Sequence, residues 1–521
     1  MRQPVLFLIS LVFLLLLIGV NVSGSYKYFG ELVYPLDDAY IHMAISKNLE
    51  QHGVWGVTRF EFSSTSSSIL YTLLLAIGFA IVGVKAWLPL AVNGLASVAI
   101  VWLVARISLR TIGGLSALIF SLLFVALVPV AGMAILGMEH TLQIFFCTLF
   151  LWLTYRKWNG EQVRDWAYAA VAFFAVMSRY ESAFVIAITG AVWLFAYRNW
   201  KQVILLAIAS SLPIIVFGLY AISQGGYFVP NSLLAKSNYV NGGIGGFVIE
   251  VSKKILYSSL LASLIIIPLA YWLLFSRGGE KNDRSNAVPM TLLVTGLTCI
   301  THQVFASFGW MFRYEAYLIA LVFVGAAISW NSWKMYFRER NLLPQAVIAV
   351  FAAAMLLPIL TRVQIPVFVG RAMKNIHDQH LQMSSFVNRY FPDAGIAMND
   401  IGTTTFFNDN IRLFDMEGLG TLEVLKIKKQ LDTTFLRNYV KEHNIGIGIF
   451  YPHLYEGKIP PEWELVGTWE ITDRFVAAGS VVGFYVIDPS LRQRMIDGLK
   501  EYSKNLPAGV IEGGLYRELK E

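Results

Sequence analysis

The sequence predicts a polytopic α-helical membrane protein with about eleven transmembrane helices and a C-terminal soluble α/β domain. Hydrophobic residues make up 56% of the 521 positions and charged residues only 14%, and the mean hydropathy is +0.57. Soluble domains carry about 25% charged residues. Near residue 361 the long apolar runs give way to a polar sequence of mixed character. Two domains are therefore expected, 1–361 in the membrane and 362–521 outside it.

Apolar runs divide the membrane part into segments close to the roughly 20 residues that one crossing requires. The expected spans are 5–20, 87–105, 112–131, 139–155, 166–178, 181–197, 203–222, 255–275, 288–308, 316–332 and 345–361. The run 69–84 is expected to be interfacial or re-entrant, because a twelfth crossing there would move every later basic loop to the opposite side. The segment 21–68 then forms the first outer loop.

Basic residues predict the orientation of the chain. The formal net charge is +7, and the excess lies in the membrane part, in alternate loops that carry residues such as Arg110, Arg156 and Lys157. By the positive-inside rule these loops face the cytoplasm. The C-terminal domain and the loop 21–68 are then on the outer, periplasmic or extracytoplasmic, side of the cytoplasmic (inner) membrane. This bias explains the basic charge, so no nucleic-acid partner is expected.

The C-terminal domain shows strand-like runs at 396–398, 445–450 and 481–487, and 420–443 has a helical pattern. Trp463 and Trp469 suit either its core or a glycan surface.

The cysteine and histidine residues of the chain do not predict a metal site. Cys147 and Cys299 both lie in expected spans, so no disulfide framework or thiolate metal site is expected. His377 and His380 have a spacing that suits metal ligation on a helix, but we expect them to be solvated. Asp400 is expected to stabilise a turn.

Asp37 and Asp38 are the first candidates for chemistry, because adjacent carboxylates disfavour each other's ionisation and can hold a proton for acid/base work. An ordinary solvated loop or a helix N-cap is the alternative. No cofactor is expected and no metal ligand is assigned, although paired carboxylates also suit Mg²⁺ or Mn²⁺.

Further charged residues gather at the outer mouths of three expected spans. The three motifs are Gly137-Met-Glu-His140, Ser178-Arg-Tyr-Glu181 and Phe312-Arg-Tyr-Glu315. The spans around the second motif are short, so Arg179 and Glu181 are expected in a protein-lined cavity below the membrane surface. A structural ion pair is the alternative. In Pro230-Asn-Ser and the residues that follow, Lys236 is either a lysine that binds an anionic lipid head or a generic interfacial lysine.

Taken in order, these motifs resemble those of the membrane-embedded GT-C glycosyltransferases. The resemblance rests on Asp37-Asp-Ala-Tyr-Ile, Gly137-Met-Glu139, Ser178-Arg-Tyr-Glu181, Pro230-Asn-Ser with Lys236, and Arg313-Tyr, over roughly residues 30–420. The most similar group is the arabinofuranosyltransferase-like enzymes of bacterial cell envelopes. Protein O-mannosyltransferases and the lipid A aminoarabinose transferase are more distant. The chain departs from the usual pattern at His42, at His140 and in 63–68.

The resemblance implies a GT-C-like membrane domain that transfers a sugar from a polyprenyl-phosphate donor to an envelope glycan, lipid or protein acceptor. Asp37, sharing its proton with Asp38, is then expected to deprotonate the acceptor hydroxyl in an inverting displacement. The residues expected to bind the donor phosphate are Lys236, Arg313 and Arg179. Those expected to bind sugar or acceptor are Tyr40, His42, Glu139, His140, Glu181 and Asn231.

Two other classes of function remain open from the residues. A flippase or transporter of lipid-linked sugars also places buried charges near cavities, but it predicts carboxylates near the bilayer midplane and an inverted repeat. The two Arg-Tyr-Glu triplets instead face one side. An envelope glycan polymerase or ligase would rely on a large outer loop between late helices, whereas here the first loop and the C-terminal domain dominate.

Overall fold

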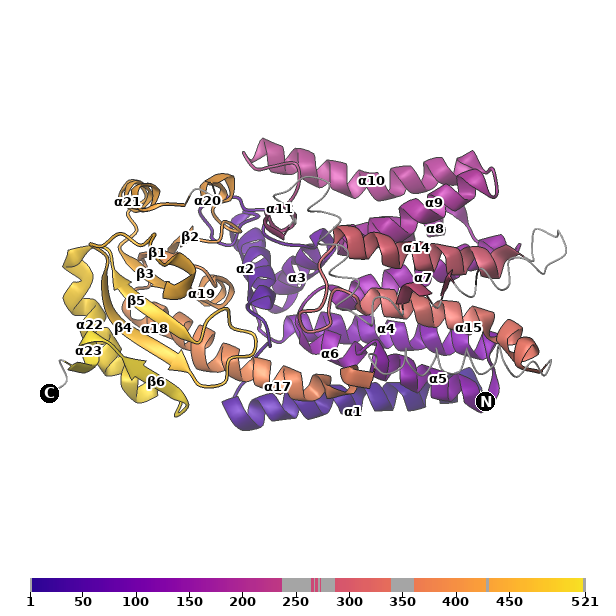
Figure 1. Cartoon of the computed structure of the whole chain (residues 1–521), viewed down its shortest axis with the longest axis horizontal. Helices are drawn as coiled ribbons and strands as arrows, with labels where there is room; N and C mark the ends of the chain where they lie inside the picture. Colours follow the sequence, from indigo (N-terminus) through magenta and orange to yellow (C-terminus); the bar gives the residue numbers. More distant parts are fainter. Residues whose placement is uncertain are drawn as a thin grey trace.

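The computed structural model describes residues 2–236, 286–338, 360–427 and 431–518, together with positions 264–266, 268, 269 and 272. A helical bundle forms one end of the molecule and a sheet with its covering helices forms the other (Figure 1). The expected spans 255–275 and 345–361 lie almost entirely outside the described residues.

The bundle contains most of the apolar sequence. Its helices are α1 (Gln3–Phe29), α2 (Asp37–His52), α3 (Ile69–Val82), α4 (Leu88–Thr111), α5 (Gly114–Leu127), α6 (Val130–Ile135), α7 (His140–Trp158), α8 (Asp165–Ser178), α9 (Ala183–Phe195), α10 (Trp200–Ser223), α11 (Asn231–Lys236), α14 (Ala287–Phe305) and α15 (Ala316–Arg338). Five described helices are long and apolar enough to cross a membrane, namely α1, α4, α10, α14 and α15. The helices α3, α5, α8 and α9 are apolar but shorter.

Two expected segments differ from the prediction. The run 112–131 is divided into α5 and α6, because Pro129 has no backbone N–H and its ring opposes a continuous helix. The expected outer loop 21–68 contains helical structure, since α1 continues to Phe29 and α2 occupies Asp37–His52. Two acids in the first turn of α2 and a left-handed glycine after its last turn, Gly53, favour this helix.

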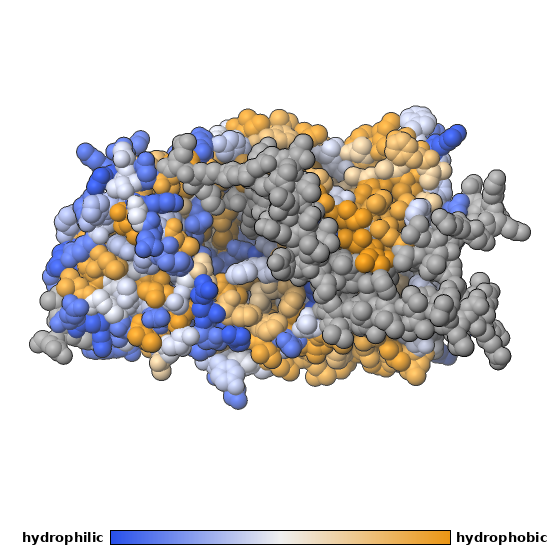
Figure 2. All heavy atoms as spheres, in the orientation of Figure 1, coloured by the Kyte–Doolittle hydropathy of each residue, from blue (hydrophilic) through white to orange (hydrophobic). Residues whose placement is uncertain are grey.

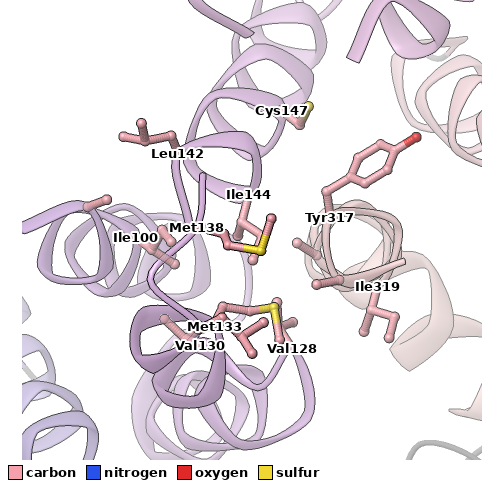
Figure 3. Close-up of a cluster of buried hydrophobic side chains, with 14 of the residues drawn as sticks. Ile100, Val128, Val130, Met133, Met138, Leu142, Ile144, Cys147, Tyr317 and Ile319 are labelled. Carbon is pink, nitrogen blue, oxygen red and sulfur yellow. The ribbon is translucent and has the colours of Figure 1, made fainter. Parts of the chain in front are cut away.

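Apolar side chains from four helices pack together in the middle of the bundle. Figure 3 shows this buried cluster, with labelled residues from α4, α6, α7 and α15. They include Ile100, Val130, Met133, Leu142, Ile144, Cys147, Tyr317 and Ile319, all nearly or fully buried. The cluster fixes the start of α7, where the Gly137-Met-Glu-His140 motif lies.

The C-terminal part is a six-stranded sheet of order β2-β1-β3-β5-β4-β6. The strands are β1 (Gly395–Met398), β2 (Arg412–Asp415), β3 (Ile447–Phe450), β4 (Glu464–Ile471), β5 (Val481–Val486) and β6 (Val510–Gly513). Strand β1 pairs in parallel with β2 and β3, and the remaining pairs are antiparallel. The three strand-like runs of the sequence are thus confirmed as β1, β3 and β5.

Helices cover the sheet and connect it to the bundle. They are α17 (Ile365–Asn375), a π-helix (Ile376–Leu381), α18 (Gln382–Tyr390), α19 (Gly402–Phe407), α20 (Leu422–Ile427), α21 (Thr433–Glu442), α22 (Arg492–Tyr502) and α23 (Leu515–Glu518). The helical pattern at 420–443 therefore corresponds to α20 and α21. Trp463 and Trp469 are both buried in the core of this domain.

The surface follows the same division. Hydrophobic residues gather over the helical bundle and hydrophilic residues over the sheet domain (Figure 2). At the end of the bundle away from the sheet domain, Arg110 and Arg156 both pair with Glu161, and Lys157 pairs with Asp165. This arrangement is typical of a membrane protein with basic loops at one end.

Candidate functional site

The candidate site begins at α2, which lies beside α19 where the bundle meets the sheet domain (Figure 1). Asp37 and Asp38 are the first two residues of α2, where negative charge is favourable at the positive end of the helix dipole. Their carboxylates bind in different directions. Asp37 contacts the sheet domain and Asp38 contacts the bundle.

Asp37 binds the start of α19. Its Oδ2 accepts the backbone N–H of Gly402 at 2.6 Å and its Oδ1 accepts that of Thr403 at 2.8 Å. These N–H groups have no partner within their own helix, so Asp37 caps a helix 365 positions further along the chain. Burial raises the pKa of Asp37 to about 6, opposed by the charge of His380 and by the two N–H groups and reinforced by Asp400.

Asp38 pairs with a buried arginine. Its Oδ2 lies 2.7 Å from Nη2 of Arg313, which is 2% exposed, while the Asp38 side chain is 32% exposed. Arg313 also donates a hydrogen bond to the Tyr314 hydroxyl at 2.9 Å. Asp38 lines a small cavity whose other lining residues are Ile41, His42, Thr65, Ser67, Met138, Ser232 and Leu419.

The turn before Arg313 has an unusual backbone. Trp310, Met311 and Phe312 all have positive φ angles of 44°, 59° and 60°. Bulky side chains rarely adopt this left-handed region, and each such residue costs on the order of 1–3 kcal/mol. The surrounding fold therefore holds Arg313 in place against a local conformational cost.

Glu139 is the centre of a second charged group and is fully buried. Its Oε1 accepts hydrogen bonds from Arg179 Nη1 at 2.5 Å and from Ser67 Oγ at 2.7 Å. Its Oε2 lies 3.1 Å from Nε2 of His42. Arg179 also pairs with Glu181 through Nη2 at 2.6 Å. Each charge in this group thus has an opposite partner, as a buried charge requires.

A larger cavity of about 410 Å³ adjoins the one at Asp38. Ser67 and Ser232 line both cavities. The polar residues that line the larger cavity include Arg179, Tyr180, Glu181, Ser307 and Tyr314. Its apolar lining residues are Phe184, Val229, Leu233, Leu234, Phe305 and Ala306. The combined space suits a ligand with an apolar part and a charged head.

Two predicted site residues, Tyr40 and Asn231, have hydrogen-bond partners within the protein. The Tyr40 hydroxyl accepts the backbone N–H of Tyr34. Asn231 binds Ser64 and the carbonyl oxygen of Leu419, which joins α11 to the sheet domain.

The remaining predicted residues lie close to the site or beyond the described atoms. His140 is buried beside Tyr314, and neither of its ring nitrogens has a hydrogen-bond partner in the described part of the chain. The backbone of Lys236 ends α11, but its side chain lies outside the described structure.

Neither His380 nor Asp400 was predicted from the sequence to act on Asp37, but the charges of both reach it. The prediction of a solvated His380 is wrong, because the residue is 2% exposed and its Nε2 lies 2.9 Å from Oδ2 of Asp400. The π-helix turns its side chain inward, and such segments are frequent at functional sites. The close approach of α2 and α19 requires glycine at position 402, since a Cβ there would lie 2.2 Å from the backbone oxygen of Asp37.

No group of three or more His, Cys, Asp or Glu residues suited to a metal ion is found within the described ranges. A family model described as a domain of unknown function, DUF8728, matches residues 374–485. This segment contains His380, Asp400, Gly402 and Thr403. No curated protein matches the chain.

Proposed function

We propose that this chain is a membrane glycosyltransferase that transfers a sugar from a polyprenyl-phosphate donor to an envelope glycan, lipid or protein acceptor. The reaction takes place on the outer side of the cytoplasmic membrane. The observation that supports this most is the 2.7 Å pair of Asp38 and Arg313 at a cavity that adjoins a larger, partly apolar one. A carboxylate beside a cation at the edge of an apolar space suits a lipid-linked anionic donor.

In this mechanism the Asp37 and Asp38 pair supplies the base. One carboxylate takes the proton of the acceptor hydroxyl while that oxygen forms a bond to the anomeric carbon. The bond from the anomeric carbon to the lipid phosphate breaks, and the phosphate leaves with the electron pair. A single displacement inverts the anomeric centre. General base catalysis typically contributes about 10²–10⁴-fold.

We assign the proton of the acceptor hydroxyl to Asp37, because its pKa of about 6 suits a base that works near neutral pH. Asp38 lines the cavity and holds Arg313 there through their 2.7 Å pair. Arg313 and Arg179 stabilise the charge on the leaving phosphate, as preorganised cations do at other anionic leaving groups. Lys236 is a third candidate for this role.

The test is sugar transfer by the purified full-length protein from a polyprenyl-phosphate sugar to an envelope acceptor. We expect Asp38→Asn and Asp37→Asn each to lower kcat by about 10²-fold or more, because each removes one carboxylate of the pair. Asp165→Asn is the matched control, since Asp165 begins α8 and Arg179 follows the other end of that helix. Wild-type turnover in both site variants would exclude the proposed base.

Two further arms of the assay separate the alternatives. Turnover is expected to persist in a chelator, and loss that Mn²⁺ restores would assign the aspartate pair to a cation. Transport of the lipid-linked sugar in liposomes without formation of a glycosidic bond would identify a flippase instead.

A further inference from the structure

We propose that the C-terminal domain is part of the reaction centre, with His380 as the residue that positions and supports the charge of Asp37. This inference rests on the proposed function, because it concerns the same aspartate pair. It extends that function to the segment 374–485, to which the family model assigns no activity.

The C-terminal domain forms part of the wall around the aspartate pair. Gly402 and Thr403 donate both backbone hydrogen bonds to Asp37. The carbonyl oxygen of Leu419 accepts hydrogen bonds from Thr65 at 2.8 Å and from Asn231 at 3.1 Å. Leu419 also lines the cavity at Asp38. The bundle alone therefore does not complete this site.

The C-terminal domain also supplies charged groups that act on Asp37. His380 is buried and forms a 2.9 Å contact with Asp400. The groups that act on this arrangement come from three elements: Asp37 from α2, Asp400 from the turn after β1, and Tyr451 from the end of β3. His380 is also joined to Asp37 through Thr403, whose hydroxyl donates a hydrogen bond to the His380 carbonyl oxygen at 3.2 Å and whose N–H binds Asp37. An imidazolium paired with Asp400 is a compensated charge, and it favours the ionised form of nearby carboxylates.

The direction of the electrostatic effects agrees with this geometry. Burial lowers the pKa of His380, but the hydrogen bond and charge of Asp400 and the charge of Asp37 outweigh it, so the pKa is raised overall. A charged His380 in turn opposes the effect of burial on the pKa of Asp37. Loss of that charge would leave more of Asp37 protonated near neutral pH. His380 therefore acts through Asp37 and is a positioning residue.

The main test compares kcat and KM across pH for the wild type and His380→Gln. Glutamine keeps a donor for Asp400 but carries no charge. We expect the acid limb of kcat/KM to move upward by about one pH unit, with KM for the donor unchanged. Turnover should fall several-fold near pH 6 and recover by about pH 8, which a misfolded protein would not do. His377→Gln is the matched control, because His377 lies on the same π-helix and contacts Asp378 and Phe29 instead.

A second measurement does not depend on activity. Hydrogen exchange at the amides of Gly402 and Thr403 should speed up in Asp37→Ala, which removes their acceptor. Gly402→Ala should lower kcat at every pH, because its Cβ would force α19 away from Asp37. Gly446→Ala is the control in the same domain, since its Cβ would meet the flexible side chain of Leu491.

The outcomes distinguish the two proposals. A wild-type protein that transfers no sugar from any polyprenyl-phosphate donor would overturn the proposed function. An active wild type whose pH profile is the same in His380→Gln would overturn the inference alone. Unchanged amide exchange in Asp37→Ala would also contradict it.

Discussion

At the scale of single residues, two carboxylates of the site pair with the same arginine but differ in their burial. Arg179 binds both Glu139 and Glu181, but Glu139 is fully buried whereas the Glu181 side chain is 14% exposed and lines the larger cavity. Glu139 also contacts His42 and Ser67. Glu139 therefore has a structural role in this charged group, whereas Glu181 can contact a ligand in the cavity.

This difference predicts unequal losses of stability. Glu139→Gln breaks a buried pair and should lower the free energy of unfolding by about 3–5 kcal/mol. Glu181→Gln leaves Arg179 paired with Glu139, and water reaches the side chain at position 181. The free energy of unfolding should therefore fall by less. Thermal unfolding of both variants in one detergent measures this. Equal losses would contradict the assignment.

At the scale of elements, helices and strands followed the sequence where a single segment determines them. The strand-like runs became β1, β3 and β5, because short continuous apolar runs suit strands that are buried on both faces. The helix α2 was missed since its sequence, with Asp37, His42 and Lys47, is only weakly apolar. Most of this helix is nevertheless buried, because its polar side chains find partners on distant elements.

The Gly137-Met-Glu139 motif illustrates an element that only glycine can complete. Gly137 has a φ angle of +69°, and a Cβ there would lie 2.5 Å from the ring of Tyr34. Gly137→Ala should therefore destabilise the protein by more than 1 kcal/mol. Gly94→Ala in α4 is the matched control, because its Cβ would meet nothing within 4 Å. Helix propensity favours that change by about 0.5–1 kcal/mol. Melting temperatures that move in the same direction would contradict this account.

At the scale of the whole molecule, α2 holds α19 at both of its ends. Asp37 binds the first N–H groups of α19, and Lys47 donates hydrogen bonds to the carbonyl oxygens of Thr405 and Phe406 near the last turn. Lys47 is 4% exposed and also pairs with Asp409. A negative charge at the start and a positive charge at the end both complement the dipole of α19. This contact joins the sheet domain to the bundle.

Lys47→Met should weaken that joint. The methionine keeps the apolar stem but loses every donor, so we expect a loss on the order of 3 kcal/mol. Limited proteolysis should then release the sheet domain at a lower temperature than in the wild type. Lys85→Met is the control at an exposed position. Identical cleavage in the two variants would show that Lys47 does not hold the domains together.

The sequence predicted the two-part organisation and the residues that collect near the cavities, including Asp38, Arg179 and Arg313. Composition and charge patterns carry that information within each segment. The pairing of α2 with α19 could not be predicted, because it depends on which distant peptide groups come to face Asp37. His380 was missed for the same reason, since only its neighbours make it a buried ion partner.

The hydrogen bonds to Asp37 come from main-chain N–H groups, which every amino acid except proline supplies. Position 403 can therefore vary among relatives with no compensating change at position 37. We therefore expect no correlated substitutions between α2 and α19 among relatives, although position 402 should remain glycine. A chimaera that joins the helical bundle of one relative to the sheet domain of another would need matching backbone shapes where α2 meets α19. It would not need matching side chains there.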